Sequence, residues 1–93
     1  MRLTAEAAKG GRLVYSNHAN ERIRERGIIK PEVEYVLEHG HHEARKDSYS
    51  EEFQAWDYAI RGKTLDGRNL RVVVAIVAPN ILVVTTIDLD KED

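Results

Sequence analysis

The chain contains no cysteine among its 93 residues. Disulfide bonds and thiolate metal sites are therefore excluded, and a reducing compartment suits the sequence. Long hydrophobic segments are also missing: the longest apolar run, residues 72–78, ends at Pro79 and falls far short of the roughly 20 residues of a membrane helix. The mixed residues 1–11 do not resemble a signal peptide, so we expect a cytoplasmic protein with no membrane partner.

The chain also lacks an excess of basic residues. The formal net charge is −2 and the pI is about 6.1, whereas proteins that bind nucleic acid over a large surface usually carry a basic excess. The chain has 42% hydrophobic residues, enough for one core. We expect a single domain over residues 1–93, with its core at about 12–89 and residues 1–11 and 90–93 at the periphery. Basic residues that could contact nucleic acid do gather locally, at Arg22, Arg24, Arg26 and Lys30.

Helices are predicted in the first half of the chain. Ser16 or Asn17 can begin a helix that ends at Gly27, and Pro31 suits the first turn of a second helix that ends at Gly40. The apolar stripe of the first helix is thin, so we expect it to pack against the core along one narrow edge.

Strands are predicted at residues 12–15, 53–60, 70–77 and 81–89, with a further short one near 43–49. Asp66-Gly67 is a strong hairpin signal, and Pro79-Asn80 marks another turn. The predicted fold class is α+β: two N-terminal helices packed on a small antiparallel sheet, in the order β-α-α-β-β-β.

The densest functional signal lies on the first predicted helix. His18, Arg22 and Arg26 recur every four residues, so on a helix they form one stripe. Arginine can grip phosphate with two parallel hydrogen bonds, and a histidine beside it can move a proton at neutral pH. A solvated helix face is the alternative, because glutamates stand three residues from arginines along the same segment.

Other residues give weaker signals. The histidines His39, His41 and His42 suggest a metal site, but no standard ligand spacing accompanies them, so we expect no metal and no cofactor. Trp56 and Tyr58 share one face of a predicted strand, where a place in the core is favoured over stacking on bases. Thr85 and Thr86 must point to opposite faces of their strand, so one of them can enter a site.

The run from Ser16 to Ile28 resembles the opening signature of the domain of unknown function 4258 family. That signature is a His-Ala pair, an arginine three residues on, and then Arg-Gly-Ile. The later helix and strands also follow in order, so the resemblance extends from Tyr15 to Ile87. The matching residues of the signature are His18, Ala19, Arg22, Arg26, Gly27 and Ile28.

That family is similar to the RelE/ParE-like toxin superfamily. The resemblance implies a toxin-like, metal-independent endoribonuclease, or a ribosome-associated RNA-cleaving protein, of a toxin-antitoxin type system. His18 would transfer the proton, while Arg22 and Arg26 would hold the scissile phosphate. Thr85 and Tyr58 would line the cleft, and the 2′-hydroxyl of the RNA would be the nucleophile. RNA or the ribosome, and an antitoxin protein, would be the partners.

A non-enzymatic module on the same fold is the alternative function. It would bind a protein or a small anionic ligand through the arginine stripe, or form a homodimer through a sheet edge. The acidic balance of the chain favours this alternative.

Overall fold

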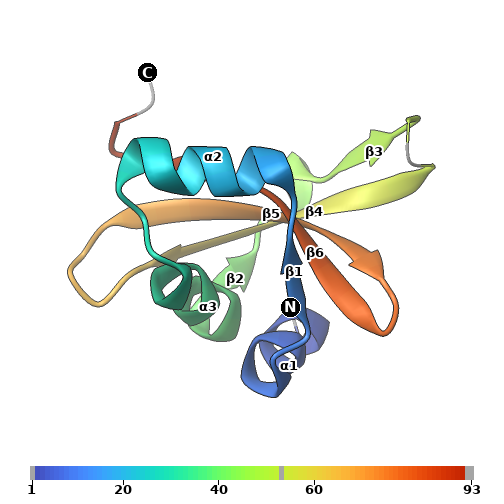
Figure 1. The fold of residues 1–93 in the computed structure, drawn as a ribbon, viewed down its shortest axis with the longest axis horizontal. Helices are drawn as coiled ribbons and strands as arrows, with labels where there is room; N and C mark the ends of the chain where they lie inside the picture. Colours follow the sequence, from blue (N-terminus) through green and yellow to red (C-terminus); the bar gives the residue numbers. More distant parts are fainter. Residues whose placement is uncertain (1, 53, 92–93) are drawn as a thin grey trace.

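The computed structural model describes residues 2–52 and 54–91 (Figure 1). Four residues lie outside the described part: Met1, Glu92 and Asp93, which were predicted at the periphery, and Phe53, which was predicted to begin a strand. The described part of the chain forms an α+β fold, with helices and strands in this order: α1 (Arg2–Gly10), β1 (Leu13–Tyr15), α2 (Asn17–Arg26), α3 (Lys30–His39), β2 (His41–His42), the short 3₁₀-helix η1 (Ala44–Lys46), β3 (Ser48–Ser50), β4 (Ala55–Lys63), β5 (Asn69–Val77) and β6 (Asn80–Asp88).

The sheet is mixed, with the strand order β1-β6-β5-β4-β2 and β3 also paired to β4. The hairpins β4–β5 and β5–β6 are antiparallel as predicted, and Asp66-Gly67 lies in the turn of the first. The prediction of a wholly antiparallel sheet is wrong at β1, which pairs parallel to β6 with Leu13 opposite Ile81. The reason is topological: the three-stranded meander returns β6 in the direction of β1, and parallel neighbours require a long crossover, here through the helices.

One hydrophobic core joins the helices to one face of the sheet. It takes Ala19 and Ile23 from α2, and Val33, Val36 and Leu37 from α3. From the sheet it takes alternate positions of the long strands, as expected for side chains that share a face, namely Ile60, Leu70, Val72, Val74, Ile81 and Val83.

Residues 2–10, expected at the periphery, form α1 and add Ala7 and Ala8 to this core. Thr4 is buried on the same side of α1. The spacing 4, 7, 8 is that of a buried helical stripe, but one of threonine and alanines carries little hydrophobic signal. A third helix therefore packs where two were predicted, and α1 contacts α3.

The opposite surface of the sheet, called here the far face, carries the intervening residues. A β-bulge between Val73 and Val74 inserts one extra residue into β6, so Val84 joins this surface as well. The far face comprises Asp57, Ala59 and Arg61 from β4, Arg71, Val73 and Ala75 from β5, and Leu82, Val84 and Thr85 from β6.

Helix α2 runs beside β6, beyond the end of β1, and is fixed at both ends. At its start the Ser16 side chain accepts a hydrogen bond from Ala19 N at 3.0 Å. It ends at Gly27, whose φ of 63° is the left-handed conformation that glycine adopts readily. There Arg68 donates to Gly27 O at 3.2 Å and lies 3.8 Å from Asp88 of β6. None of the described helices is both long and apolar enough to span a membrane.

The prediction that Trp56 lies in the core is wrong. Its side chain is 50% exposed and meets Tyr49 of β3 edge to face, with ring centroids 5.7 Å apart. Figure 1 shows the reason: β3 and the start of β4 project away from the helices, so no apolar layer covers them.

Candidate functional site

A groove with a largely apolar floor opens on the far face. Its volume is about 580 Å³. Most of its lining is hydrophobic, and its titratable side chains are His18 and Asp57. The lining residues, which define the far-face groove, are Ser16, His18, Ala55, Asp57, Ala75, Ile76, Val77, Leu82 and Val84. Apolar grooves with a few polar groups are the usual form of a ligand site.

His18 enters this groove from the first turn of α2. The turn is held to the sheet by Ser16, whose backbone N donates to Val83 O at 3.0 Å and whose hydroxyl donates to Val84 O at 2.8 Å. Because Ser16 also caps α2, the same residue sets both the helix start and its distance from β6. His18 itself is exposed and so can meet a ligand in the groove.

Asp57 enters the groove from β4, opposite Ala75 of β5. Partial burial among apolar side chains raises the pKa of its carboxyl above the usual value of 3.8. Asp57 was not predicted as a site residue, because an acidic residue between Trp56 and Tyr58 fits the solvent side of a strand equally well. One signal was available: Asp57 is the lone charged residue of the predicted strand 53–60.

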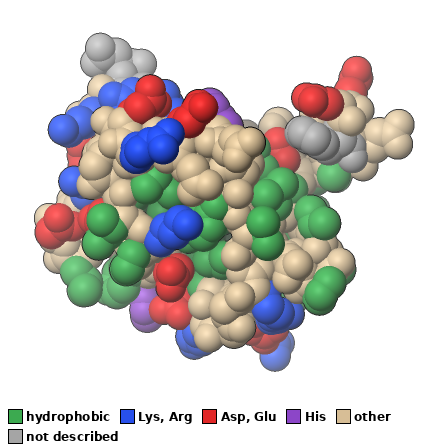
Figure 2. All heavy atoms as spheres, viewed as in Figure 1, with side chains coloured by type: hydrophobic (Ala, Val, Ile, Leu, Met, Phe, Trp, Pro, Cys, Tyr) green, Lys and Arg blue, Asp and Glu red, His purple; other side chains and the backbone are tan. Residues whose placement is uncertain are grey.

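The predicted arginines follow His18 along α2. Arg22 and Arg26 stand on the same flank of the helix, one and two turns further on, and both are half-buried with their Nε atoms inaccessible to solvent. Thr85 belongs to the far face, opposite Val73. In Figure 2, basic side chains with some acidic ones gather where α2 runs, above a hydrophobic area. The structure therefore brings His18 and Thr85 to the far face, with the two arginines on the flank of α2 that carries His18.

Three other predicted residues lie elsewhere. Tyr58 sits on the helix side of β4, opposite Val74, and packs against the core with its ring 5.9 Å from that of His42. The sheet thus separates Tyr58 from the far-face groove. Lys30 places its Nζ 4.6 Å from the centroid of the Tyr15 ring, a cation–π contact at the start of α3. Arg24 is exposed on α2 and does not line the groove.

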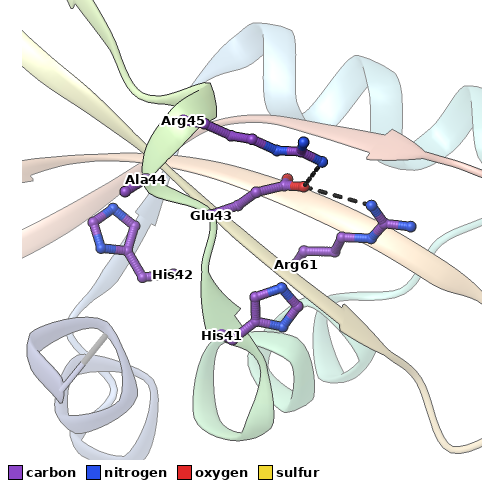
Figure 3. A pocket seen from close by; sticks show the side chains of 6 residues that line it. All are labelled: His41, His42, Glu43, Ala44, Arg45 and Arg61. Atoms are coloured by element: carbon purple, nitrogen blue, oxygen red, sulfur yellow. Dashed lines mark hydrogen bonds and ion pairs between the residues drawn. The ribbon is translucent and has the colours of Figure 1, made fainter.

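A second hollow on the far face was not predicted. It lies at the other end of β4, has a volume of about 450 Å³, and is shown in Figure 3. We call it the arginine hollow, and its lining residues are His41, His42, Glu43, Ala44, Arg45 and Arg61. Its residues come from β2, η1, the residue between them and β4, so no local spacing in the sequence marks it.

Glu43 is the centre of the arginine hollow and is 7% exposed. Its Oε1 lies 2.7 Å from Arg71 Nε. Its Oε2 lies 3.5 Å from Arg61 and 3.7 Å from Arg45. The hydrogen bond from Arg71, helped by the charge of the arginines, lowers the pKa of Glu43 to about 2. One buried carboxylate therefore meets three guanidinium groups.

The histidines whose closeness in the sequence suggested a metal site do not converge. His42 Nε2 pairs with Asp47 Oδ2 at 2.8 Å, and Asp47 also accepts a hydrogen bond from Ala59 N. His41 lies opposite Arg61 on β4, whereas His42 lies opposite Ile60 and so faces the other side of the sheet. In the described part of the chain, no three histidine or acidic side chains come together in a way that could hold a metal ion.

Comparison with known proteins gives one match. The sequence model of the family described as "Domain of unknown function (DUF4258)" matches residues 15–88. The match begins at Tyr15, the last residue of β1, and takes in the signature on α2 and all the strands from β2 to β6. No curated protein and no solved structure matches the chain.

Proposed function

The chain belongs to the DUF4258 family, and we propose that it is a toxin-like, metal-independent endoribonuclease, acting on free or ribosome-bound RNA and related to the RelE/ParE-like toxins. The observation that carries this proposal is the pair of proton-transfer groups in one groove. His18 comes from α2 and Asp57 from β4, and both line the far-face groove. A general acid and a general base in one cleft is what RNA cleavage by transesterification needs.

The two groups divide the proton transfers between them. His18 takes the proton of a ribose 2′-hydroxyl as that oxygen attacks the adjacent phosphorus. The bond from phosphorus to the 5′-oxygen breaks, and the leaving oxygen takes a proton from the carboxyl of Asp57, whose pKa is raised by partial burial. The products are a 2′,3′-cyclic phosphate and a 5′-hydroxyl, and no metal is a reactant.

Charge stabilisation falls to the arginines of α2. Negative charge grows on the phosphate oxygens in the transition state, and guanidinium groups held in place stabilise it without reorganising. Arg22 and Arg26 continue the flank of α2 that begins with His18, and their half-buried stems restrict their motion. Thr85 adds a hydroxyl to the floor of the far face. Tyr58 has no part in this proposal, because it faces the core side of the sheet.

Cleavage of single-stranded RNA in the presence of a chelator tests the proposal. We expect the protein to produce 2′,3′-cyclic phosphate ends, and His18→Ala and Asp57→Asn each to lower the rate by about 100-fold or more. His39→Ala is the matched control, because His39 is exposed and lies outside the groove. If neither free nor ribosome-bound RNA is cut, or if His18→Ala cuts as fast as the unaltered protein, the proposal is wrong.

A binding module is the second candidate, favoured by the apolar floor of the groove. Leu82 and Val77 line both the groove and the neighbouring hollow that includes Val14, so the apolar surface extends beyond the two titratable groups. An antitoxin-like protein or a second copy of the chain would cover it. Light scattering across a concentration series tests the second version: Leu82→Asp should abolish a dimer that His39→Ala, outside the groove, leaves intact. A strictly monomeric protein would exclude the dimer.

A further inference from the structure

The arginine hollow holds more positive charge than its carboxylate balances. Arg71 makes the one short contact to Glu43, at 2.7 Å, through a side chain that is only 16% exposed. Arg61 and Arg45 reach the other carboxylate oxygen at 3.5 and 3.7 Å, and their side chains are 41% and 78% exposed. These two contacts are long for charge-assisted hydrogen bonds, which are usually about 2.7–2.9 Å. Two guanidinium groups are thus held near one point without strong partners there.

We propose that the arginine hollow binds a phosphate-class anion between Arg45 and Arg61. In Figure 3 both guanidinium groups turn toward the Glu43 carboxylate from either side. A phosphate oxygen accepts hydrogen bonds from a planar guanidinium in pairs, which neither group makes with Glu43. His41, opposite Arg61 on the neighbouring strand, supplies a further donor at the mouth of the hollow.

Glu43 organises this site rather than blocking it. Its negative charge is balanced by Arg71, so the four charged groups leave two positive charges for a ligand. Its second oxygen holds Arg45 and Arg61 near their binding positions before the anion arrives. Flexible side chains lose entropy when a ligand orders them, and this loss is smaller for groups that are already restrained.

The arginine hollow lies on the same face of the sheet as the far-face groove, further along β4. Arg61 follows Asp57 by four residues on β4, which places it roughly 13 Å further along the strand at 3.3 Å per residue. Both side chains belong to the far face. The anion can be free phosphate, or a phosphate of an RNA strand that also lies in the groove. The RNA source rests on the proposed function; the anion site itself does not.

Titration with inorganic phosphate at constant ionic strength, followed by the arginine side-chain NMR signals, tests the site. We expect saturable shifts of the Arg45 and Arg61 signals, and at least a tenfold weaker affinity in Arg61→Gln and in Arg45→Gln. Arg2→Gln is the matched control, because it removes the same charge from α1, at an arginine paired with Glu6. Both test variants keep the Arg71–Glu43 pair, and their melting temperatures verify folding. Affinities equal to that of Arg2→Gln, or no shifts at either arginine, would overturn the proposal.

A second titration with a 2′-O-methylated single-stranded RNA, which cannot be cleaved, identifies the source of the anion. If Arg61→Gln lowers the salt dependence of RNA binding by about one phosphate contact, the ligand is the RNA backbone. If phosphate binds but Arg61→Gln leaves RNA binding unchanged, the ligand is a free anion. Phosphate binding by a protein that neither binds nor cleaves RNA would keep this site and reject the proposed function. Cleavage that His18→Ala abolishes, with no phosphate binding at Arg61, would do the reverse.

Discussion

Arg71 Nε lies 2.7 Å from Glu43 Oε1, so a buried ion pair joins β5 to the segment after β2 across the far face. Removing the carboxylate charge leaves the arginines around it without their shared partner. We expect Glu43→Gln to lower the free energy of unfolding by about 2 kcal/mol at neutral pH, as for a hydrogen bond to a charged group. Urea denaturation measures this loss. Glu6→Gln breaks an exposed pair with Arg2 and should change it by less than about 1 kcal/mol; equal effects would contradict the assigned role of Glu43.

The same pair predicts a pH dependence. The pKa of Glu43 falls from 4.5 to about 2 on folding, so its contribution is complete above pH 4.5 and is lost as the pH falls toward 2. The difference in melting temperature between the unaltered protein and Glu43→Gln should therefore shrink across this window. Thermal scans at steps between pH 7 and 2 measure it. A difference that stays constant with pH would mean that the charge of Glu43 does not stabilise the fold.

Asp57 should show the opposite sign. Its folded-state pKa is raised by burial, so the charged carboxylate is unfavourable in the folded protein above that pKa, and the penalty vanishes below the ordinary value of 3.8. Asp57→Asn is thus expected to melt at a slightly higher temperature than the unaltered protein at pH 7, and at the same temperature near pH 3. Because the same substitution should reduce RNA cleavage, stability and activity would move in opposite directions. A lower melting temperature at pH 7 would show that Asp57 is structural.

Ser16 tests how α2 is held to the sheet. Ser16→Ala removes the hydrogen bonds to Ala19 N and Val84 O, and we expect a loss of about 1–2 kcal/mol in the free energy of unfolding. The start of α2 should also loosen, which faster hydrogen exchange of its first amides would reveal. Ser48→Ala on exposed β3 should stay within about 0.5 kcal/mol of the unaltered protein. If Ser16→Ala is as stable as Ser48→Ala, the Ser16 cap does not hold α2 to the sheet.

Gly40 is the residue at which α3 meets β4. A Cβ there would lie 2.5 Å from Val36 O and 2.6 Å from Arg61 O, and both are backbone atoms that cannot step aside. Gly40→Ala should cost about 2–3 kcal/mol through overpacking. Gly10→Ala is the control: its Cβ would lie 3.3 Å from the flexible Arg12 side chain, at the end of α1. Calorimetry should find that variant no less stable than the unaltered protein, and a similar loss in both would refute the close-approach argument.

Local signals predicted the ends of several elements, although they did not predict α1. Ser16 and Gly27 bound α2, Gly40 ends α3, and Asp66-Gly67 turns the chain between β4 and β5, because each acts within a few residues of itself. The direction of β1 could not be found in this way, since three residues carry no information about a partner that lies far along the chain.

The candidate site was predicted only in part, because only some of its residues lie close together in the sequence. The stripe of His18 and the two arginines is local to one helix, so its spacing was visible. Asp57 becomes informative only when folding places it in the same groove as His18 of α2. Glu43 follows β2 and Arg71 lies on β5. The two are 28 residues apart in the sequence, so nothing near either residue indicates the pair. Tyr58 packs against the core, as the alternation along its strand favoured, whereas the family resemblance alone had placed it in the cleft.

The pairing of β1 with β6 also determines the order in which the molecule can be assembled. The two strands join residues 68 positions apart, and Ser16 reaches Val84 across the same interval. During synthesis β1 has no strand partner until β6 leaves the ribosome, so the groove, which needs α2 beside β6, is completed only at that step. An RNA-cleaving protein built in this way would stay inactive on its own ribosome until nearly the whole described chain had emerged.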